Sequence, residues 1–157
     1  MLEIKTEGFA GALEAMSSLD LDLQRKILKK ALTTAAGPVV FREKQNARRN
    51  RDSGLLADSI YVTVKVDKAG EATANIRPSG KLVVVMQTEP DGTKRQVRTR
   101  ASAYAHLVEF GSKHVSARPF ARPALAESMG EIEAGFAAEV NAAVSKATAK
   151  ANRAAKK

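Results

Sequence analysis

The sequence predicts a single α+β domain, in which an antiparallel sheet of three or four strands is packed by a long N-terminal helix and a long C-terminal helix. Apolar residues recur at helical spacing before residue 50, alternate with the period of a strand between residues 60 and 99, and return to helical spacing after Leu125. The chain has 157 residues, enough for one core that buries about two thirds of the unfolded surface. We expect one domain over residues 1–145 and a basic tail over residues 146–157 that is frayed or disordered.

The N-terminal half predicts one long helix that is kinked or broken near Pro38. Either Asp20 or Asp22 can cap its start, because a short acidic side chain accepts a hydrogen bond from the first free N–H groups. Gly37 and Pro38 interrupt the pattern, since a proline inside a helix removes a hydrogen bond and clashes with the preceding turn. The helix then continues over residues 39–47. The residues that its first part turns inward are Leu23, Ile27, Ala31 and Ala35.

The middle of the chain predicts antiparallel strands. Residues 60–66 alternate apolar and polar side chains, as in a strand with one buried face, and residues 72–76 repeat the pattern more weakly. Residues 82–86 are continuously apolar, which predicts a more central strand. The turn signal at residues 89–92 then leads into a returning strand near residues 96–99.

The C-terminal helix has the clearest periodicity of the chain. Burying one large apolar side chain is worth about 1.5 to 3 kcal/mol, whereas an exposed charge pair contributes about 1 kcal/mol at most. We therefore expect its apolar face to pack on the sheet, with a subunit contact as the alternative. The residues at helical spacing are Leu125, Met129, Ile132, Phe136, Val140 and Val144.

A structural joint is predicted just before this helix. Residues 103–110 have helical spacing, and Gly111 follows where a helix commonly ends in a left-handed residue. Prolines bias the preceding residue away from the helical region, so residues 115–120 are expected to be extended. Arg122 is then the expected cap and Pro123 the first helical position, where its missing N–H costs nothing.

One ion pair is expected to fix this joint. Glu109 lies close in sequence to Arg118 and Arg122, and an arginine can form a charge-assisted, bidentate bond with a carboxylate. Either Arg118 or Arg122 can be the partner of Glu109. The residues assigned to the structural joint are Glu109, Phe110, Gly111, Arg118, Pro119, Phe120, Arg122 and Pro123.

The residue inventory argues against catalysis. The chain has no cysteine, which excludes a disulfide, a thiolate metal site and a cysteine nucleophile. His106 and His114 flank Glu109, but their spacing is not that of a helical HExxH zinc site. The chain has no serine in a GxSxG nucleophile-elbow motif and no glycine-rich phosphate-binding loop. It also has no pair of carboxylates at a spacing that indicates a catalytic site. We expect no enzyme activity, no catalytic residue, no metal and no cofactor.

The net charge of +9 requires an explanation. Basic residues form three clusters, around residues 42–51, 94–100 and 146–157. The chain has no tryptophan, and its few aromatic residues lie in apolar patterns rather than among the basic clusters, so nothing suggests stacking on bases. We expect nonspecific contact with passing DNA at most, or contact with acidic subunits. The candidate interface or DNA-facing residues are Arg48, Arg49, Arg51, Lys94 and Arg95.

Two motifs resemble those of a known family. The first joins residues 109–112, EFGS, to residues 117–125, ARPFARPAL, and the second is GLLADSI at residues 54–60. On these motifs the chain resembles the neck or tail-completion proteins of long-tailed bacteriophages. This siphovirus family of minor tail proteins is typified by gene product ten of the lambdoid phage Hong Kong ninety-seven. The resemblance spans residues 9–144, with Ser112 where threonine is usual.

The resemblance implies a structural virion protein, located in the neck or tail and assembled in the cytoplasm of the bacterial host. Residues 1–145 would be a neck or tail-completion domain that joins head and tail. The implied partners are further copies in a sixfold ring around the DNA channel, the head connector or head-closure protein, and the tail terminator or tail-tube protein. A closed ring needs two different, complementary patches on each subunit.

Two alternatives stay open. One is a related virion role, as tail terminator or head-closure protein. The other is a small basic protein that associates with DNA without sequence specificity. No charged segment followed by an apolar run opens the chain, and no apolar run approaches the roughly 20 residues of a bilayer span, so we expect neither secretion nor membrane insertion.

Overall fold

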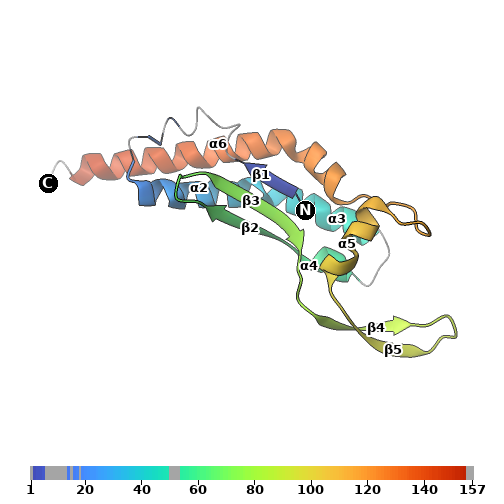
Figure 1. The fold of residues 1–157 in the computed structure, drawn as a ribbon. Helices are drawn as coiled ribbons and strands as arrows, with labels where there is room; N and C mark the ends of the chain where they lie inside the picture. Colours follow the sequence, from blue (N-terminus) through green and yellow to red (C-terminus); the bar gives the residue numbers. More distant parts are fainter. Residues whose placement is uncertain (1, 6–13, 15, 18, 50–53, 155–157) are drawn as a thin grey trace.

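The computed structural model describes residues 2–5, 14, 16–17, 19–49 and 54–154. It confirms the α+β class, with an elongated body and a two-stranded ribbon that projects from one end (Figure 1). Among the described residues, none of the helices combines the length and apolar character that a membrane span needs. In chain order the elements are β1 (Leu2–Lys5), α2 (Leu21–Ala35), α3 (Gly37–Arg49), α4 (Leu55–Ser59), β2 (Ile60–Val66), β3 (Ala72–Pro78), β4 (Val83–Thr88), β5 (Lys94–Thr99), α5 (Ala101–Phe110) and α6 (Ala121–Ala154).

The body contains a three-stranded antiparallel sheet in the order β1-β3-β2. β2 and β3 pair along their whole length, with Val62 opposite Ile76, and β1 places Leu2 opposite the same Ile76. The inward face of β3 is made of small and branched residues, Ala72, Ala74 and Ile76, all of which are buried. The predicted alternation in β2 and β3 is therefore confirmed, while the strand β1 was not predicted.

The two remaining strands do not join this sheet. β4 and β5 pair only with each other among the described strands, with Val85 opposite Val97. The expectation of a more central strand at residues 82–86 is wrong, because β4 lies in the projecting ribbon (Figure 1) and Val84 and Met86 are largely exposed. An apolar run indicates burial, but the described part of the body leaves Val84 and Met86 of this run exposed.

The long helices form layers over the sheet. α2 contacts both strands of the β2-β3 pair on one side and α6 on the other, and α3 also packs against α6. The C-terminal helix therefore lies mainly on α2 and α3, and the expectation that it packs directly on the sheet is corrected. Large side chains that fill the space between the layers are Leu28, Leu32, Val39, Ile60, Ile76, Phe136 and Val140.

The helix break occurs where the sequence predicts it. Asp20 caps α2, with its Oδ2 atom accepting a hydrogen bond from the N–H of Asp22 at 3.1 Å. α2 ends at Ala35 and α3 begins at Gly37, so Pro38 lies in the first turn of a new helix, where its missing N–H is tolerated. Breaking the helix before the proline therefore avoids an unpaired carbonyl in the middle of one long helix.

Fewer of the apolar residues of α6 are buried than their helical spacing predicts. Ile132, Phe136 and Val140 are buried as expected, but Met129 is 50% exposed and the neighbouring Ser128 is buried in its place. Ser128 is accommodated because Arg42 of α3 donates a hydrogen bond to its Oγ atom at 2.8 Å. α6 continues as a helix to Ala154, and the fraying expected for the basic tail stays a prediction.

Candidate functional site

The joint between α5 and α6 is held in one conformation by a hydrogen bond and by close backbone packing around Gly111. α5 ends at Gly111, whose φ of 78° lies in the left-handed region, and the N–H of Gly111 donates to the carbonyl of Leu107 at 2.8 Å. A Cβ atom at this position would lie 2.8 Å from the Ala117 nitrogen and 2.9 Å from the Val115 oxygen. Residue 111 must therefore be a glycine both for its backbone angle and for the chain that packs over it.

The carboxylate of Glu109 organises the start of α6. Although it sits on the last turn of α5, it is 6% exposed and accepts hydrogen bonds from the N–H groups of Phe120, Ala121 and Arg122 at 2.8, 2.9 and 3.2 Å. These N–H groups belong to the first turn of a helix and have no partner within it. Glu109 therefore caps α6 from a different helix, in a position where the helix dipole also favours a negative charge.

Arg122 completes this arrangement. Its Nε atom donates to Glu109 Oε1 at 3.0 Å and its Nη2 atom donates to the Glu109 carbonyl at 3.3 Å. Its guanidinium also lies 5.0 Å from the centre of the Phe110 ring. Of the two expected partners of Glu109, the structure places Arg122 in contact. Arg118 is anchored differently, through a backbone N–H that donates to the Val108 carbonyl at 2.8 Å.

The start of α6 differs by two residues from the prediction. The helix begins at Ala121, so Arg122 is a helical residue rather than the cap, and Pro123 lies in the first turn rather than at the first position. The cap is supplied by Glu109 from outside the segment, and local sequence gives no signal for it. Pro123 is still tolerated, because N–H groups in the first turn have no acceptor in their own helix. Pro119 lies in the non-helical segment, as expected.

Charge and burial have opposite effects on the pKa of Glu109. Burial raises this pKa, but the N–H groups of Ala121, Phe120 and Arg122 and the Arg122 side chain outweigh that effect and hold the pKa below its usual value. The carboxylate is therefore ionised at neutral pH. Its stabilising contribution is present above the pKa of the unfolded chain and is lost as the pH falls through the lower pKa of the folded chain.

A second buried carboxylate, Glu43, lies on α3. It is 1% exposed, and its Oε1 atom has no hydrogen-bond partner within the described part of the chain. Burial raises its pKa to about 7, and the charge of Glu109 contributes to this rise. No local pattern singles out Glu43, because its neighbours Arg42 and Lys44 suggest an exposed charged face.

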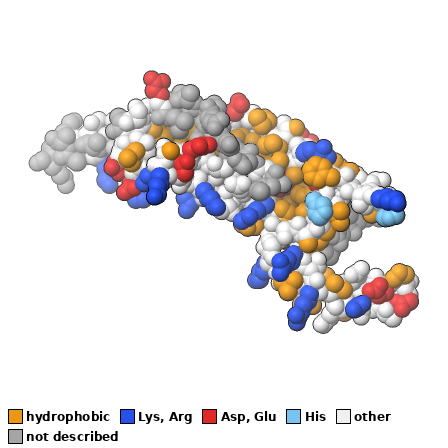
Figure 2. Space-filling view, in the orientation of Figure 1, with side chains coloured by type: hydrophobic (Ala, Val, Ile, Leu, Met, Phe, Trp, Pro, Cys, Tyr) orange, Lys and Arg blue, Asp and Glu red, His pale blue; other side chains and the backbone are white. Residues whose placement is uncertain are grey.

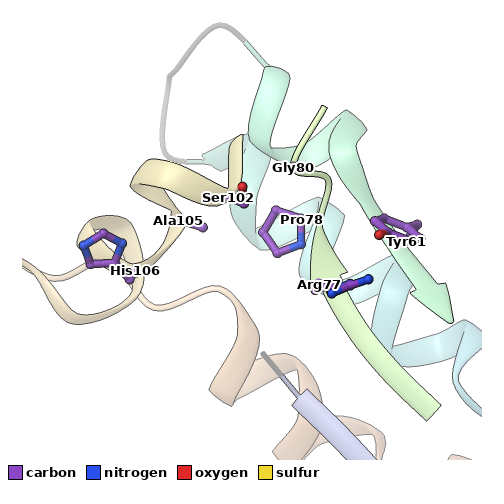
Figure 3. Close-up of a pocket in the computed structure, with 7 residues that line it drawn as sticks. All are labelled: Tyr61, Arg77, Pro78, Gly80, Ser102, Ala105 and His106. Carbon is purple, nitrogen blue, oxygen red and sulfur yellow. The ribbon is translucent and has the colours of Figure 1, made fainter. Parts of the chain in front are cut away.

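A pocket of about 400 Å³ lies between the end of β3 and the face of α5 (Figure 3). Tyr61 and Arg77 form one wall, with the guanidinium 5.8 Å from the centre of the ring, while Ser102 and His106 come from α5. Among the described residues, the lining holds no carboxylate.

Metal binding has no support in the described residues. No group of three histidine, cysteine, aspartate or glutamate side chains lies close enough to hold an ion in the part of the chain that the structure describes. The Glu109 carboxylate, which lies between His106 and His114 in sequence, is directed at the backbone of α6. The two histidines are exposed.

The predicted basic positions are distributed over several elements. Arg48 and Arg49 are exposed at the end of α3, with Arg48 3.4 Å from Asp58. Lys94 and Arg95 are exposed on β5, whereas Arg51 lies outside the described residues. Lysine and arginine side chains line the lower edge of the face in Figure 2, from the body to the ribbon. This edge suits contact with a phosphate backbone or with an acidic protein surface.

Comparison with known proteins identifies one family. A family model described as "Bacteriophage HK97-gp10, putative tail-component" matches residues 9–111. The match includes α5 and ends at Gly111, so the capping residue Glu109 lies inside it and the start of α6 lies beyond it. Comparison with curated proteins and with solved structures found no match.

We expect Glu109→Gln to lower the free energy of unfolding by about 2 to 3 kcal/mol, since hydrogen bonds to a charged group are worth more than those to a neutral amide. Urea denaturation at pH 7 measures the change. Glu133→Gln, on the exposed face of α6, is the matched control and is expected to have little effect. Equal stability of the two variants would contradict the capping role.

We expect Gly111→Ala to be more destabilising than the same change at Gly92. Both glycines have a positive φ, 78° and 84°, but a Cβ atom meets nothing within 4 Å at Gly92 and meets backbone atoms at Gly111. Backbone strain costs about 1 to 3 kcal/mol at either site, and the clash adds to it only at Gly111. Thermal unfolding of the two variants measures the difference, and identical losses would show that the loop moves aside.

Glu43→Gln is expected to change the pH dependence of stability. The folded-state pKa of Glu43 is raised to about 7 from 4.5, so its neutral form favours the folded chain at low pH and this advantage is lost as the pH rises through 7. The wild type should lose about 2 to 3 kcal/mol between pH 5 and pH 8 from this group. Urea denaturation across that range should show a flatter profile for Glu43→Gln, whereas parallel profiles would exclude the effect.

Proposed function

This chain belongs to the HK97-gp10-like family of bacteriophage tail components, and from that membership we propose that it is a structural subunit of the phage neck. In this proposal it completes the tail and joins it to the head, as part of a ring around the DNA channel. A phage tail component is a virion protein, and its association is with other structural proteins of the virion.

The observation that carries the proposal is a rigid joint that presents apolar side chains to solvent. Phe110 is 67% exposed, Val115 is 58% exposed and Leu107 is 42% exposed, although the backbone around them is fixed by Glu109 and Gly111. Exposed apolar residues grouped at one place favour a protein contact. A pre-formed surface also loses little conformational entropy on assembly.

A ring around DNA limits how much positive charge can face the channel. A channel that lets DNA pass cannot bind it tightly, and many phosphate contacts would make binding both strong and dependent on salt. Arg42 is already used inside the fold, where it bonds to Ser128 and Glu131. Arg48 and Arg49 are exposed at the end of α3, and we assign these charges chiefly to acidic surfaces of partner proteins.

Three other functions have a specific observation in their favour. The tail terminator and head-closure roles fit the same exposed joint, because each also places a subunit between neighbouring rings. A DNA-associated role fits the basic edge in Figure 2. It predicts that the isolated chain binds duplex DNA with an affinity that falls steeply as salt rises, and it gives no reason for the exposed apolar joint.

A phage with a stop codon in this gene tests the proposal. We expect electron microscopy of the lysate to show DNA-filled heads beside separate tails, because a missing neck subunit prevents joining without preventing either half from forming. Expression of the wild-type gene from a plasmid should restore joined particles. Overlong tails would identify a tail terminator instead, and heads that have lost their DNA would favour head closure. Normal infectious particles would refute a virion role.

A further inference from the structure

The charges of α6 are separated along its length. Its acidic residues lie between residues 127 and 139, and no aspartate or glutamate follows Glu139 in the sequence. The described helix beyond that point carries only positive charge, from Lys146, Lys150 and Arg153, and all three are exposed. α6 runs alongside α2 and continues past the start of that helix (Figure 1). Its last turns therefore form a positively charged extension of the body.

These basic side chains share the side of α6 on which α2 lies. With 3.6 residues in each turn, residues 146, 150 and 153 fall on the same side of the helix as Glu139, and Glu139 forms an ion pair with Lys30 of α2. A groove of about 170 Å³ lies between the two helices at this point. It is lined by lysines from both helices, Lys26, Lys30 and Lys146, and by the small side chains of Ala142 and Ala143.

α2 supplies the other half of this surface. Lys29 and Lys30 lie three and four residues after Lys26, so the three side chains project from one side of α2, and all of them are exposed. Lys30 pairs with Glu139, whereas Lys26 and Lys29 form no ion pair within the described residues. The α2–α6 basic surface, as we call the combined set, consists of Lys26, Lys29, Lys30, Lys146, Lys150 and Arg153.

The carboxylates nearby do not neutralise this surface. Asp20 caps α2, Asp22 lies 3.5 Å from Arg25, and Asp67 accepts a hydrogen bond from the N–H of Glu71 at 2.8 Å. Even with Glu14, which precedes α2, and Glu139 counted, the described carboxylates at this end of the body number six. The described basic residues there number nine, which are the six of the α2–α6 basic surface together with Arg25, Lys65 and Lys68.

The fold itself gains little from this arrangement. Lys26 and Lys30 are like charges four residues apart on one helix and repel each other, as do Lys146 and Lys150. The helix dipole favours positive charge in the last turn, where Arg153 lies, but not in the first half of α2, where Lys26 lies. A surface with uncompensated repulsion of this kind is expected to have an anionic partner.

We propose that the α2–α6 basic surface contacts the phosphate backbone of duplex DNA. The inference goes beyond the neck function, because it stands on these basic residues alone. In the proposed ring, the contact turns the end of the body that carries the start of α2 and the last turns of α6 toward the DNA channel. It also separates the DNA from Arg48 and Arg49, which lie at the far end of α3 and which we assign to acidic partner surfaces.

The composition of the surface fits phosphates better than a protein partner. Protein interfaces are depleted in lysine and enriched in aromatic residues, methionine and arginine, whereas five of these six residues are lysines and none is aromatic. A helix that binds a membrane surface carries large apolar side chains beside its positive charges, but α6 places Ala142 and Ala143 in the groove. An acidic protein surface is the remaining occupant, and the crosslinking experiment separates it from DNA.

The same composition is compatible with the passage of DNA. Lysine binds a phosphate as a point charge, without the bidentate geometry of arginine, and a surface without aromatic side chains does not stack on bases. The contact therefore has no sequence preference, and the duplex can slide along it. Because the binding is electrostatic, its strength depends mainly on the salt concentration.

Salt-dependent binding of the purified full-length chain tests the proposal. In fluorescence anisotropy with a short labelled duplex, we expect a dissociation constant of about 1 to 100 μM at physiological salt. A plot of log affinity against log salt should have a slope of about −4 to −5, as for about five contacted phosphates. The triple variant Lys26→Gln, Lys146→Gln and Lys150→Gln should flatten this slope by about three and weaken binding by roughly tenfold or more. Circular dichroism checks that the variant is folded.

The matched control removes the same charge elsewhere. Arg48→Gln, Arg49→Gln and Lys94→Gln change three exposed residues outside the α2–α6 basic surface, and this variant is expected to keep the wild-type slope. Equal flattening in the two triple variants would show that only net charge matters, which overturns the proposal. Failure of the wild-type chain to bind the duplex overturns it as well.

Crosslinking identifies the occupant of the surface in the assembled particle. The chain has no cysteine, so Ala142→Cys adds a single thiol that carries a photoreactive group into the groove without removing a lysine. We expect irradiation of DNA-filled particles to attach this residue to DNA. Met129→Cys, at a half-exposed position earlier in α6, is the control and should give no such product. Attachment of residue 142 to a virion protein, or no DNA product at all, would overturn the proposal.

The results for the contact and for the neck function can be separated. DNA binding alone does not distinguish a neck subunit from a small DNA-associated protein, whereas the stop-codon phage does. Binding by the wild-type chain together with normal particles from that phage would leave the contact standing and refute the neck function. Separate heads and tails together with a chain that does not bind DNA would refute the contact and leave the neck function standing.

Discussion

The hydrogen bonds from the first turn of α6 to Glu109 hold the architecture together. α6 covers both α2 and α3, so the direction in which it leaves the joint decides how the helical layers close over the sheet. A cap from a neighbouring residue would fix only the helix end. A cap from α5 also fixes the angle between two helices, and Gly111 is the residue that allows the chain to turn between them.

The body and the ribbon differ in how well their apolar side chains are packed. In the body, small residues such as Ala31, Ala74 and Ala124 allow the layers to approach closely around Phe136 and Val140. Several polar groups there are paired, as in the bonds from Arg42 to Ser128 and Glu131, whereas the buried Glu43 Oε1 atom has no hydrogen-bond partner within the described residues. On the ribbon, Val84 and Met86 are largely exposed. A protein that assembles with others can carry an exposed apolar surface on a projecting ribbon, because the stability of its core then does not depend on a partner.

Much of the body could be predicted from local pattern. Asp20 and Asp22 were the two candidate caps of α2, and Asp20 is the one that caps it. Pro38 marked the break after α2, and the alternation from Ile60 to Val66 marked β2. The failures all involve contacts between distant segments. The apolar run in β4 predicted a buried strand. The local sequence did not show that the described body leaves Val84 and Met86 exposed. Nothing near residue 120 showed that the cap of α6 comes from Glu109, and nothing near Glu43 showed that a charged residue between two cations turns inward.

The connection at the base of the ribbon limits the directions in which it can project. Arg100 alone separates β5 from α5, and the base is held by hydrogen bonds from the Ser102 N–H to the Ser79 carbonyl and from the Ser79 N–H to the Ser59 carbonyl. With so short a link, the orientation of the ribbon depends on the position of α5, and Glu109 on the same helix sets the start of α6.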